Sequence, residues 1–242
     1  MTGHAEQIDA TAPSGHECHV WWLALDDAPQ DLALLERMLS PHERERAAAF
    51  RASGPRKQFV VARAAVRTVL GRYLDIAPAA CAFSTSDQGK PSLHPPSPLR
   101  FNVSHSRDLV AIAVTHGHEV GIDVEAHRRL PDMAAIAHTI LDTQDLQEWL
   151  RAEPGEQLTA FYRIWTCKEA MAKASGRGIG IDLRALRVGI ATGSPARPLS
   201  LEPSWGAPSD WSLQELDVRA GYSAAVAAHA SQLQVRQERL HL

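Results

Sequence analysis

One segment, from Val120 to Glu125, alternates apolar and acidic residues, which is the pattern of a β-strand with two different faces. On such a strand Asp123 and Glu125 share one face, and the apolar residues between them point to the other. Gly121 lies on the acidic face, where it leaves space for a ligand or for another stretch of backbone. The pattern predicts a site on this face, and its alternative is the solvated side of an edge strand.

A second segment, residues 156–175, has helical spacing and adds a third carboxylate. Trp165, Glu169 and Lys173 follow at intervals of four and share one helix face. The opposite, apolar side is formed by Ile164, Cys167 and Met171. Lys168 lies on the flank, where it either binds phosphate or packs its aliphatic stem. Because three carboxylates suit Mg²⁺ and a lysine suits a phosphate bound to it, the two segments predict metal-assisted phosphoryl chemistry; the alternative is a solvated Glu–Lys pair.

The composition narrows the class of protein. Hydrophobic residues make up 45% and charged residues 22% of the 242 residues, as in ordinary globular proteins. The net charge of −3 provides no general basic field for nucleic acid. The three cysteines form no Cys-x-x-Cys pair, and no signal peptide or membrane-length apolar run is evident. We therefore expect a cytoplasmic protein that binds neither nucleic acid nor membrane.

Apolar periodicity predicts a mixture of strands and helices. The expected strands are residues 20–25, 81–85, 99–103, 109–114, 120–125, 186–190, 212–218 and 222–228. The expected helices are residues 32–39, 40–51, 132–141, 143–150 and 156–175, and a longer one from Pro55 onward. The turn from His116 to His118 is expected to join two strands of an antiparallel meander. The polar tail from Ser231 is expected to fray.

Two further motifs precede the acidic strand, and together they carry a family resemblance. Gly89-Lys90-Pro91-Ser92 comes first and Phe101-Asn102-Val103-Ser104-His105-Ser106 second. They are followed by the acidic strand and by the run Trp165-Thr166-Cys167-Lys168-Glu169-Ala170. In this order the motifs resemble the 4′-phosphopantetheinyl transferases, in particular the longer, pseudo-dimeric Sfp type, over residues 20–180.

The resemblance implies an α+β fold of two similar halves related by a pseudo-twofold axis, each an antiparallel sheet packed with helices. We expect a flexible leader at residues 1–17, an N-terminal half at 18–117, and a C-terminal half at 118–242 that carries the metal and catalytic motifs. The two halves show no convincing internal sequence repeat. The length favours a monomer that contains both halves.

The same resemblance implies transfer of the 4′-phosphopantetheine arm from coenzyme A to a serine of an apo acyl, peptidyl or polyketide carrier protein, with release of 3′,5′-ADP. Mg²⁺ is expected on Asp123, Glu125 and Glu169. The expected catalytic residues are Asp123, Glu169 and Lys173. Two bases remain open, Glu169 and a water on the metal.

Coenzyme A carries a 3′-phosphate besides its pyrophosphate and therefore needs several cations. By resemblance, the expected coenzyme A contacts are Arg56, Lys57, Arg63, Lys90, Ser104, His105 and Lys173. This chain departs from better-known members at Glu43-Arg44-Glu45-Arg46, where acids interrupt the basic cluster, and Arg46 is a further candidate. The expected carrier contacts are Arg128, Arg129, Met133, Ile136 and Phe161.

Two other functions fit part of the sequence. A Mg²⁺-dependent diphosphate hydrolase explains the carboxylates, but it does not explain the segments around Lys90 and Ser104. A non-catalytic module that binds coenzyme A or a carrier predicts a decayed acidic set, whereas the three acids and Lys173 are intact. Adjacent residues of a strand point apart, so Ser104 and His105 are not expected to form a nucleophile–base pair.

Overall fold

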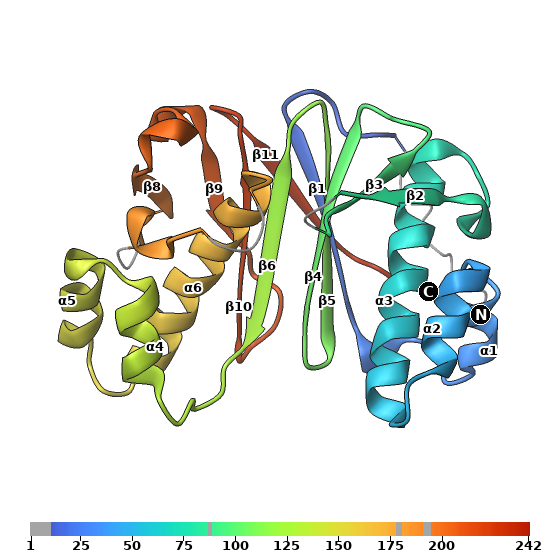
Figure 1. Cartoon of the computed structure of the whole chain (residues 1–242), viewed down its shortest axis with the longest axis horizontal. Coiled ribbons are helices and arrows are strands. Elements are labelled where there is room, and N and C mark those ends of the chain that lie inside the picture. Colours follow the sequence, from blue (N-terminus) through green and yellow to red (C-terminus); the bar gives the residue numbers. More distant parts are fainter. Residues whose placement is uncertain (1–10, 87–88, 178–180, 191–194) are drawn as a thin grey trace, which may run out of the picture.

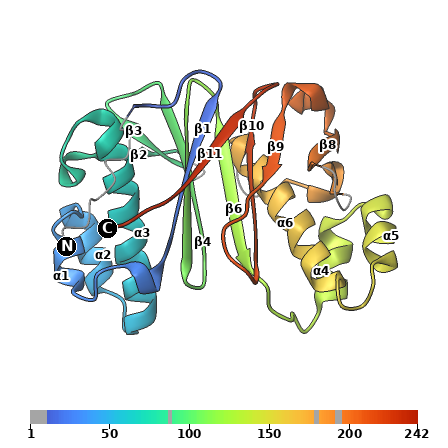
Figure 2. The ribbon, with the colours of Figure 1, turned by 180° about the vertical axis from the view of Figure 1, so that it is seen from behind.

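The computed structural model describes residues 11–86, 89–177, 181–190 and 195–242, so residues 1–10 of the expected leader lie outside the described residues. The chain forms four layers, in which two sheets face each other and helices cover both outer sides (Figures 1 and 2). Among the described residues, no helix is both long and apolar enough to cross a membrane.

The first sheet has the order β11-β1-β5-β4. Its strands are β1 (Glu17–Ala24), β4 (Leu99–Ser106), β5 (Leu109–His116) and β11 (Gln234–Arg239). The helices α1 (Leu32–Glu36), α2 (Pro41–Ala48) and α3 (Ser53–Leu74) cover its outer side (Figure 1). A separate hairpin consists of β2 (Ala82–Thr85) and β3 (Pro91–His94). The sheet is antiparallel except for the parallel pair of β1 and β11.

The prediction of a frayed tail is wrong. β11 pairs with β1 along its whole length, and Leu240 beyond it is buried in the first core. The last residues of the chain thus complete the sheet of the N-terminal half. The pattern was misleading because an edge strand exposes many polar side chains, which resembles the composition of an unstructured tail.

The second sheet has the antiparallel order β6-β10-β9. Its strands are β6 (Val120–Ala126), β9 (Ser212–Glu215) and β10 (Tyr222–Ala228). Helix α6 (Gln157–Ala174) packs on it, and α4 (Met133–Ile140) and α5 (Thr143–Arg151) lie outside α6 (Figure 2). A small hairpin pairs β7 (Arg187–Gly189) with β8 (Arg197–Ser200). Each predicted helix is present, with ends that differ by a few residues.

The predicted meander is wrong for β6. The turn at Gly117, where φ is +80°, carries the chain from the first sheet to the second, and β6 pairs with β10 instead of β5. Side-chain alternation nevertheless holds on both strands. In β5, Ile112 faces the helices of the first half and Ala111 faces the second sheet. In β6, the apolar residues face the first sheet, so the acidic residues face α6.

Gly121 permits a close approach of β6 to α6. A Cβ atom at this position would lie 2.1 Å from the carbonyl oxygen of Ala170 and 2.4 Å from the amide nitrogen of Ala174. Of the two uses expected for this glycine, the structure has the second, in which another backbone fills the space. The contact holds the carboxylates of β6 against the polar face of α6.

Candidate active site at the junction of the two sheets

Asp123 on β6 and Lys173 on α6 form the centre of the site. The Lys173 Nζ atom donates to Asp123 Oδ1 at 2.6 Å and to the carbonyl oxygen of Ile122 at 3.1 Å. Asp123 is 4% exposed, whereas the Lys173 side chain is 29% exposed. Glu169 lies one turn before Lys173 on the same helix face. The structure therefore brings together the acidic strand and the helix motif.

The three carboxylates influence one another's protonation. Burial raises the pKa of Asp123, and the bonds from Lys173 and Ser104 oppose this increase. Burial and the charge of Asp123 raise the pKa of Glu125 and of Glu169. Lys173 lowers the pKa of all three acids and Arg128 lowers that of Glu125, and a divalent cation would further favour their ionised forms.

The donor set fits a hard cation. Asp123 Oδ2 is buried without a hydrogen-bond partner, and carboxylate oxygens are the ligands that Mg²⁺ prefers. Among the described residues, however, no three histidine, cysteine or acidic side chains converge closely enough to form a ready metal cluster. Lys173 already supplies positive charge at Asp123 Oδ1. To bind a cation together with Asp123, the side chains of Glu125 and Glu169 would therefore have to move toward it.

Two serines of β4 reach the carboxylates. The Ser104 hydroxyl donates to Asp123 Oδ1 at 2.9 Å, and the Ser106 hydroxyl donates to Glu125 Oε2 at 2.7 Å. Sequence reasoning assigned Ser104 to coenzyme A phosphate and missed Ser106. Because the single hydroxyl proton of Ser104 is directed to Asp123, donation to a phosphate requires breaking that bond. The phosphate contact of Ser104 stays a prediction.

His105 points away from Ser104, toward α3. Its Nδ1 atom lies 3.4 Å from Gln58 Nε2. Burial lowers the pKa of His105, and the positive charges of Lys173 and Arg63 lower it further. His105 therefore feels the charge of both Lys173 and Arg63.

Two arginines approach the same aromatic ring. The guanidinium carbons of Arg46 and Arg63 lie 5.2 Å and 5.6 Å from the centroid of Phe59. Glu43, one of the interleaved acids, is buried, and its carboxylate binds Arg67 Nε at 2.7 Å and lies 3.7 Å from Arg63 Nε. The acid that interrupts the basic cluster thus mainly compensates Arg67.

Arg56, which was expected at the coenzyme, forms an ion pair with Glu36 of α1 at 2.5 Å. Lys57 is half-buried at the start of α3. The structure therefore places both residues near the start of α3. Their contact with coenzyme A stays a prediction.

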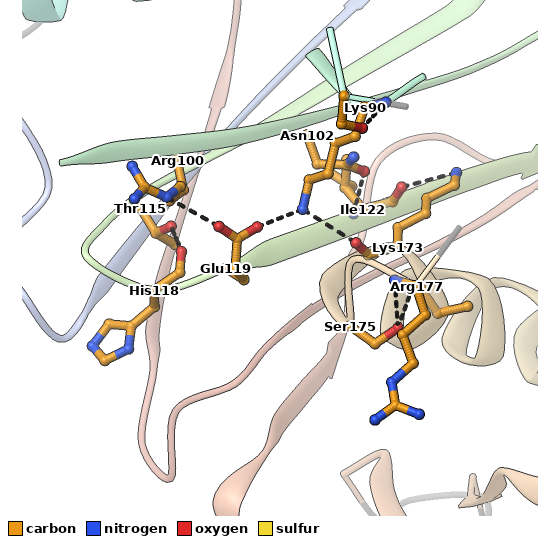
Figure 3. A network of polar contacts seen from close by, with 12 residues as sticks. Lys90, Arg100, Asn102, Thr115, His118, Glu119, Ile122, Lys173, Ser175 and Arg177 are labelled. Carbon is orange, nitrogen blue, oxygen red and sulfur yellow. Dashed lines mark hydrogen bonds and ion pairs between the residues drawn. The ribbon is translucent and has the colours of Figure 1, made fainter. Parts of the chain in front are cut away.

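Lys90 joins the two halves. Its Nζ atom donates to Glu119 Oε2 at 2.6 Å and to the carbonyl oxygen of Lys173 at 3.3 Å (Figure 3). Arg100 donates to the other oxygen of Glu119 at 3.0 Å. A cavity of about 410 Å³ adjoins this network, with Lys90, Arg100, Phe101 and Glu119 in its wall. Glu119, which the sequence reasoning did not select, is the acidic partner of both cations.

Comparison with known proteins identifies the family. Residues 119–227 match the family model described as "4'-phosphopantetheinyl transferase superfamily", and residues 25–117 match "4'-phosphopantetheinyl transferase, N-terminal". The 4'-phosphopantetheinyl transferase HetI of Nostoc sp. is 36% identical over 78% of this chain and 80% of its own length. The chain belongs to the 4′-phosphopantetheinyl transferase superfamily.

Two other relatives support this assignment. The phosphopantetheinyl transferase of Thraustochytrium sp. is 30% identical over 84% of this chain and 76% of its own. The 4'-phosphopantetheinyl transferase Sfp of Bacillus subtilis is 28% identical over 62% of this chain and 66% of its own. The expected family and fold class are therefore confirmed, and neither the hydrolase nor the non-catalytic alternative receives support.

Other predicted residues of this transferase have different roles. Lys168 is fully buried, lies 2.9 Å from Asp145 Oδ2 and donates to the carbonyl oxygen of Ile140 at 2.9 Å. Of its two expected uses, burial supports the packed stem and disfavours the phosphate contact. Trp165 is half-buried, with its ring 5.8 Å from that of Phe161. Phe161 is fully buried, so its assignment as a carrier contact is wrong.

The remaining carrier candidates lie nearer the surface. Arg128 and Arg129 are exposed in the connection after β6. Met133 and Ile136 on α4 are half-buried and pack partly on the second core. All four side chains therefore have some surface that a carrier can reach.

Proposed function

We propose that the carboxylates of Asp123, Glu125 and Glu169 hold Mg²⁺ for the transfer of phosphopantetheine from coenzyme A to a carrier serine. The transferase activity itself follows from membership of the superfamily. The observation that supports this metal assignment is the buried Asp123 with its unpartnered Oδ2, beside Lys173 and next to two acids with raised pKa. When bound, Mg²⁺ supplies charge neutralisation at the pyrophosphate.

The side chains of the site have separate roles in the transfer. The serine oxygen forms a bond to the phosphorus that carries pantetheine, and the bond from that phosphorus to the bridging oxygen breaks, which releases 3′,5′-ADP. Lys173 presents a fixed ammonium to the phosphate oxygens. Glu169 accepts the serine proton, because it lies one turn from Lys173 on the same helix face, beside the carboxylates of β6. The bonds with Lys173 and Ser104 favour the ionised form of Asp123.

Coenzyme A then extends toward the N-terminal half. Arg63 and Arg46, which lie beside Phe59, bind its 3′-phosphate together with His105 in this proposal. Lys90 binds the coenzyme after it releases Glu119, and Arg56 and Lys57 add positive charge at the start of α3. In this arrangement Lys173 is the cation nearest the reacting pyrophosphate.

The acceptor approaches from the C-terminal half. Arg128 and Arg129, with the half-exposed Met133 and Ile136, offer cations and apolar surface to a carrier helix. The carriers in question are acyl, peptidyl or polyketide carrier domains, as in a holo-[acyl-carrier-protein] synthase reaction or in secondary metabolite biosynthesis. The enzyme acts as a cytoplasmic monomer, since one chain contains both halves.

The test is incubation with coenzyme A, Mg²⁺ and a panel of apo carriers, followed by mass spectrometry of each carrier. We expect the carrier to gain one phosphopantetheine group and expect chelation of the metal to stop the reaction. Asp123→Ala should reduce turnover by about 10²-fold or more, by comparison with other losses of fixed transition-state charge. Release of phosphopantetheine without any carrier would contradict the proposal, as would full activity in a metal chelator.

A further inference from the structure

The two edges of β6 are hydrogen-bonded in different ways. One edge pairs with the backbone of β10. On the other edge, the backbone amides face β4 of the first sheet and bind side chains of that strand. The Ile122 amide donates to Asn102 Oδ1 at 3.0 Å, as Figure 3 shows. The next two amides on this edge form similar bonds: the Val124 amide donates to Ser104 Oγ at 3.3 Å, and the Ala126 amide donates to Ser106 Oγ at 3.2 Å. Alternate side chains of β4 thus replace a backbone ladder between the two halves.

Two of these three contacts lead directly to the carboxylates. A serine hydroxyl has one proton, and an oxygen that accepts an amide hydrogen must direct that proton elsewhere. Ser104 donates to Asp123, and Ser106 donates to Glu125. In each case a backbone amide donates to a serine hydroxyl, and that hydroxyl donates to a carboxylate. The two hydrogen bonds of such a chain strengthen each other. Asn102 caps β6 in the same way but contacts neither carboxylate.

Ser106 is held in place from both sides. It ends β4, and the following turn has Arg107 at a φ of +50°. Gln58 of α3 donates to the carbonyl oxygen of Arg107 at 2.9 Å, and Arg219 binds the Asp108 carboxylate at 2.6 Å. Because α3 belongs to the first half and Arg219 precedes β10 of the second, both halves fix this turn.

We propose that Ser106 is a positioning residue of the transferase: its hydroxyl aims Glu125 at the metal and transmits the alignment of the two halves to the ligand set. This inference rests on the proposed Mg²⁺ site. Without the hydroxyl, Glu125 loses its 2.7 Å bond and can rotate on the half-buried edge of the site. Loss of such an outer contact typically weakens a metal site by about 10- to 100-fold.

The test measures Mn²⁺ binding by electron paramagnetic resonance in the presence of coenzyme A, with displacement by Mg²⁺. Ser106→Ala should raise the Kd for Mn²⁺ by about 10- to 100-fold. Ser106→Thr keeps the hydroxyl and should bind nearly as wild type does. Asn102→Ala is the matched control, because it removes a cap from the same edge of β6 without touching a carboxylate. It should lower the melting temperature and leave the Kd unchanged.

Equal Mn²⁺ affinity in wild type and Ser106→Ala would overturn the role of Ser106 while leaving the metal assignment intact. Equal weakening by Asn102→Ala would also overturn it, because the effect would then come from loosening of the strand. If wild type binds no Mn²⁺ that Mg²⁺ displaces, the metal assignment and this role both fail.

Discussion

Helix α6 carries two lysines, and each forms an ion pair with a buried aspartate. Lys168 and Asp145 are 0% and 1% exposed at their side chains, and Lys168 also donates to two backbone carbonyls. Arg187 contacts the second oxygen of Asp145 at 3.3 Å. Lys173 is partly exposed, and its ion pair with Asp123 is formed through Oδ1. The Oδ2 atom of each aspartate is buried without a hydrogen bond, but Asp145 Oδ2 lies 2.9 Å from the Lys168 ammonium. We call the Lys168 pair closed, because both of its side chains are buried, and the Lys173 pair open, because its lysine is partly exposed.

The difference comes from what surrounds each pair. Five residues separate the two lysines, so they point to faces about 140° apart on the helix. One face meets α4, α5 and the turn at Leu183, which fill the space around Lys168 with protein groups. The other meets β6, where two further carboxylates gather. A buried ion pair alone is therefore weak evidence of function, and a partly exposed pair beside further carboxylates is stronger evidence.

The largest effect is expected when a substitution breaks the closed pair of Lys168 and Asp145. Lys168→Met leaves Asp145 buried with only Arg187 as a cation, so it should lower the free energy of unfolding by about 3–5 kcal/mol. Urea denaturation followed by circular dichroism measures this change. Adding Asp145→Leu should restore much of the loss, since no uncompensated charge remains. A loss below about 1 kcal/mol, the value typical of an exposed pair, would show that the pair is not closed as described.

The sequence predicts the different roles of these two lysines only in part. Spacing places Lys173 on a face with Glu169, but the partner of Lys168 comes from α5, whose packing on α6 is a tertiary contact. Alternation correctly predicts which side of β6 is acidic. It does not predict which strand pairs with β6, because the turn at Gly117 is compatible with either sheet. Ser106 was missed because its role appears only when β4 lies beside β6.

The second prediction concerns the open pair of Lys173 and Asp123. Lys173→Met removes the ammonium beside the reacting phosphates and should reduce turnover by about 10²–10³-fold. It also leaves Asp123 uncompensated, so the metal-free variant should melt at a lower temperature than wild type. Mg²⁺ should reverse that loss, because the vacated oxygen can bind the ion. Thermal unfolding with and without Mg²⁺ measures the recovery.

Lys168→Met is the control for this recovery, since Mg²⁺ cannot reach its buried aspartate. Recovery of both variants to the same extent would show that Mg²⁺ acts on the whole protein, and the distinction between open and closed pairs would then be wrong. Absence of recovery in Lys173→Met would mean that the cation does not bind Asp123.

The smallest effect concerns the stability of the open site, and it has an unusual sign. Burial and the charge of Asp123 raise the pKa of Glu169 above its value in the unfolded chain. Within the interval between these two values, the folded protein binds more protons than the unfolded one, so stability falls as pH rises. Above the folded pKa, the full penalty of the ionised acid remains. Glu169→Gln has no such penalty and should melt at a higher temperature than wild type at neutral pH without metal.

Thermal unfolding from about pH 4 to about pH 8 tests this sign. The difference between variant and wild type should be smallest at the acid end, where Glu169 is mostly protonated in both states, and should grow toward neutral pH. Mg²⁺ should stabilise wild type more than the variant and so reduce the difference, while turnover of the variant stays low. A difference independent of pH would contradict the raised pKa. Near-normal turnover of Glu169→Gln in Mg²⁺ would remove Glu169 as ligand and base, and would leave Asp123 and Glu125 as the acids of the open site.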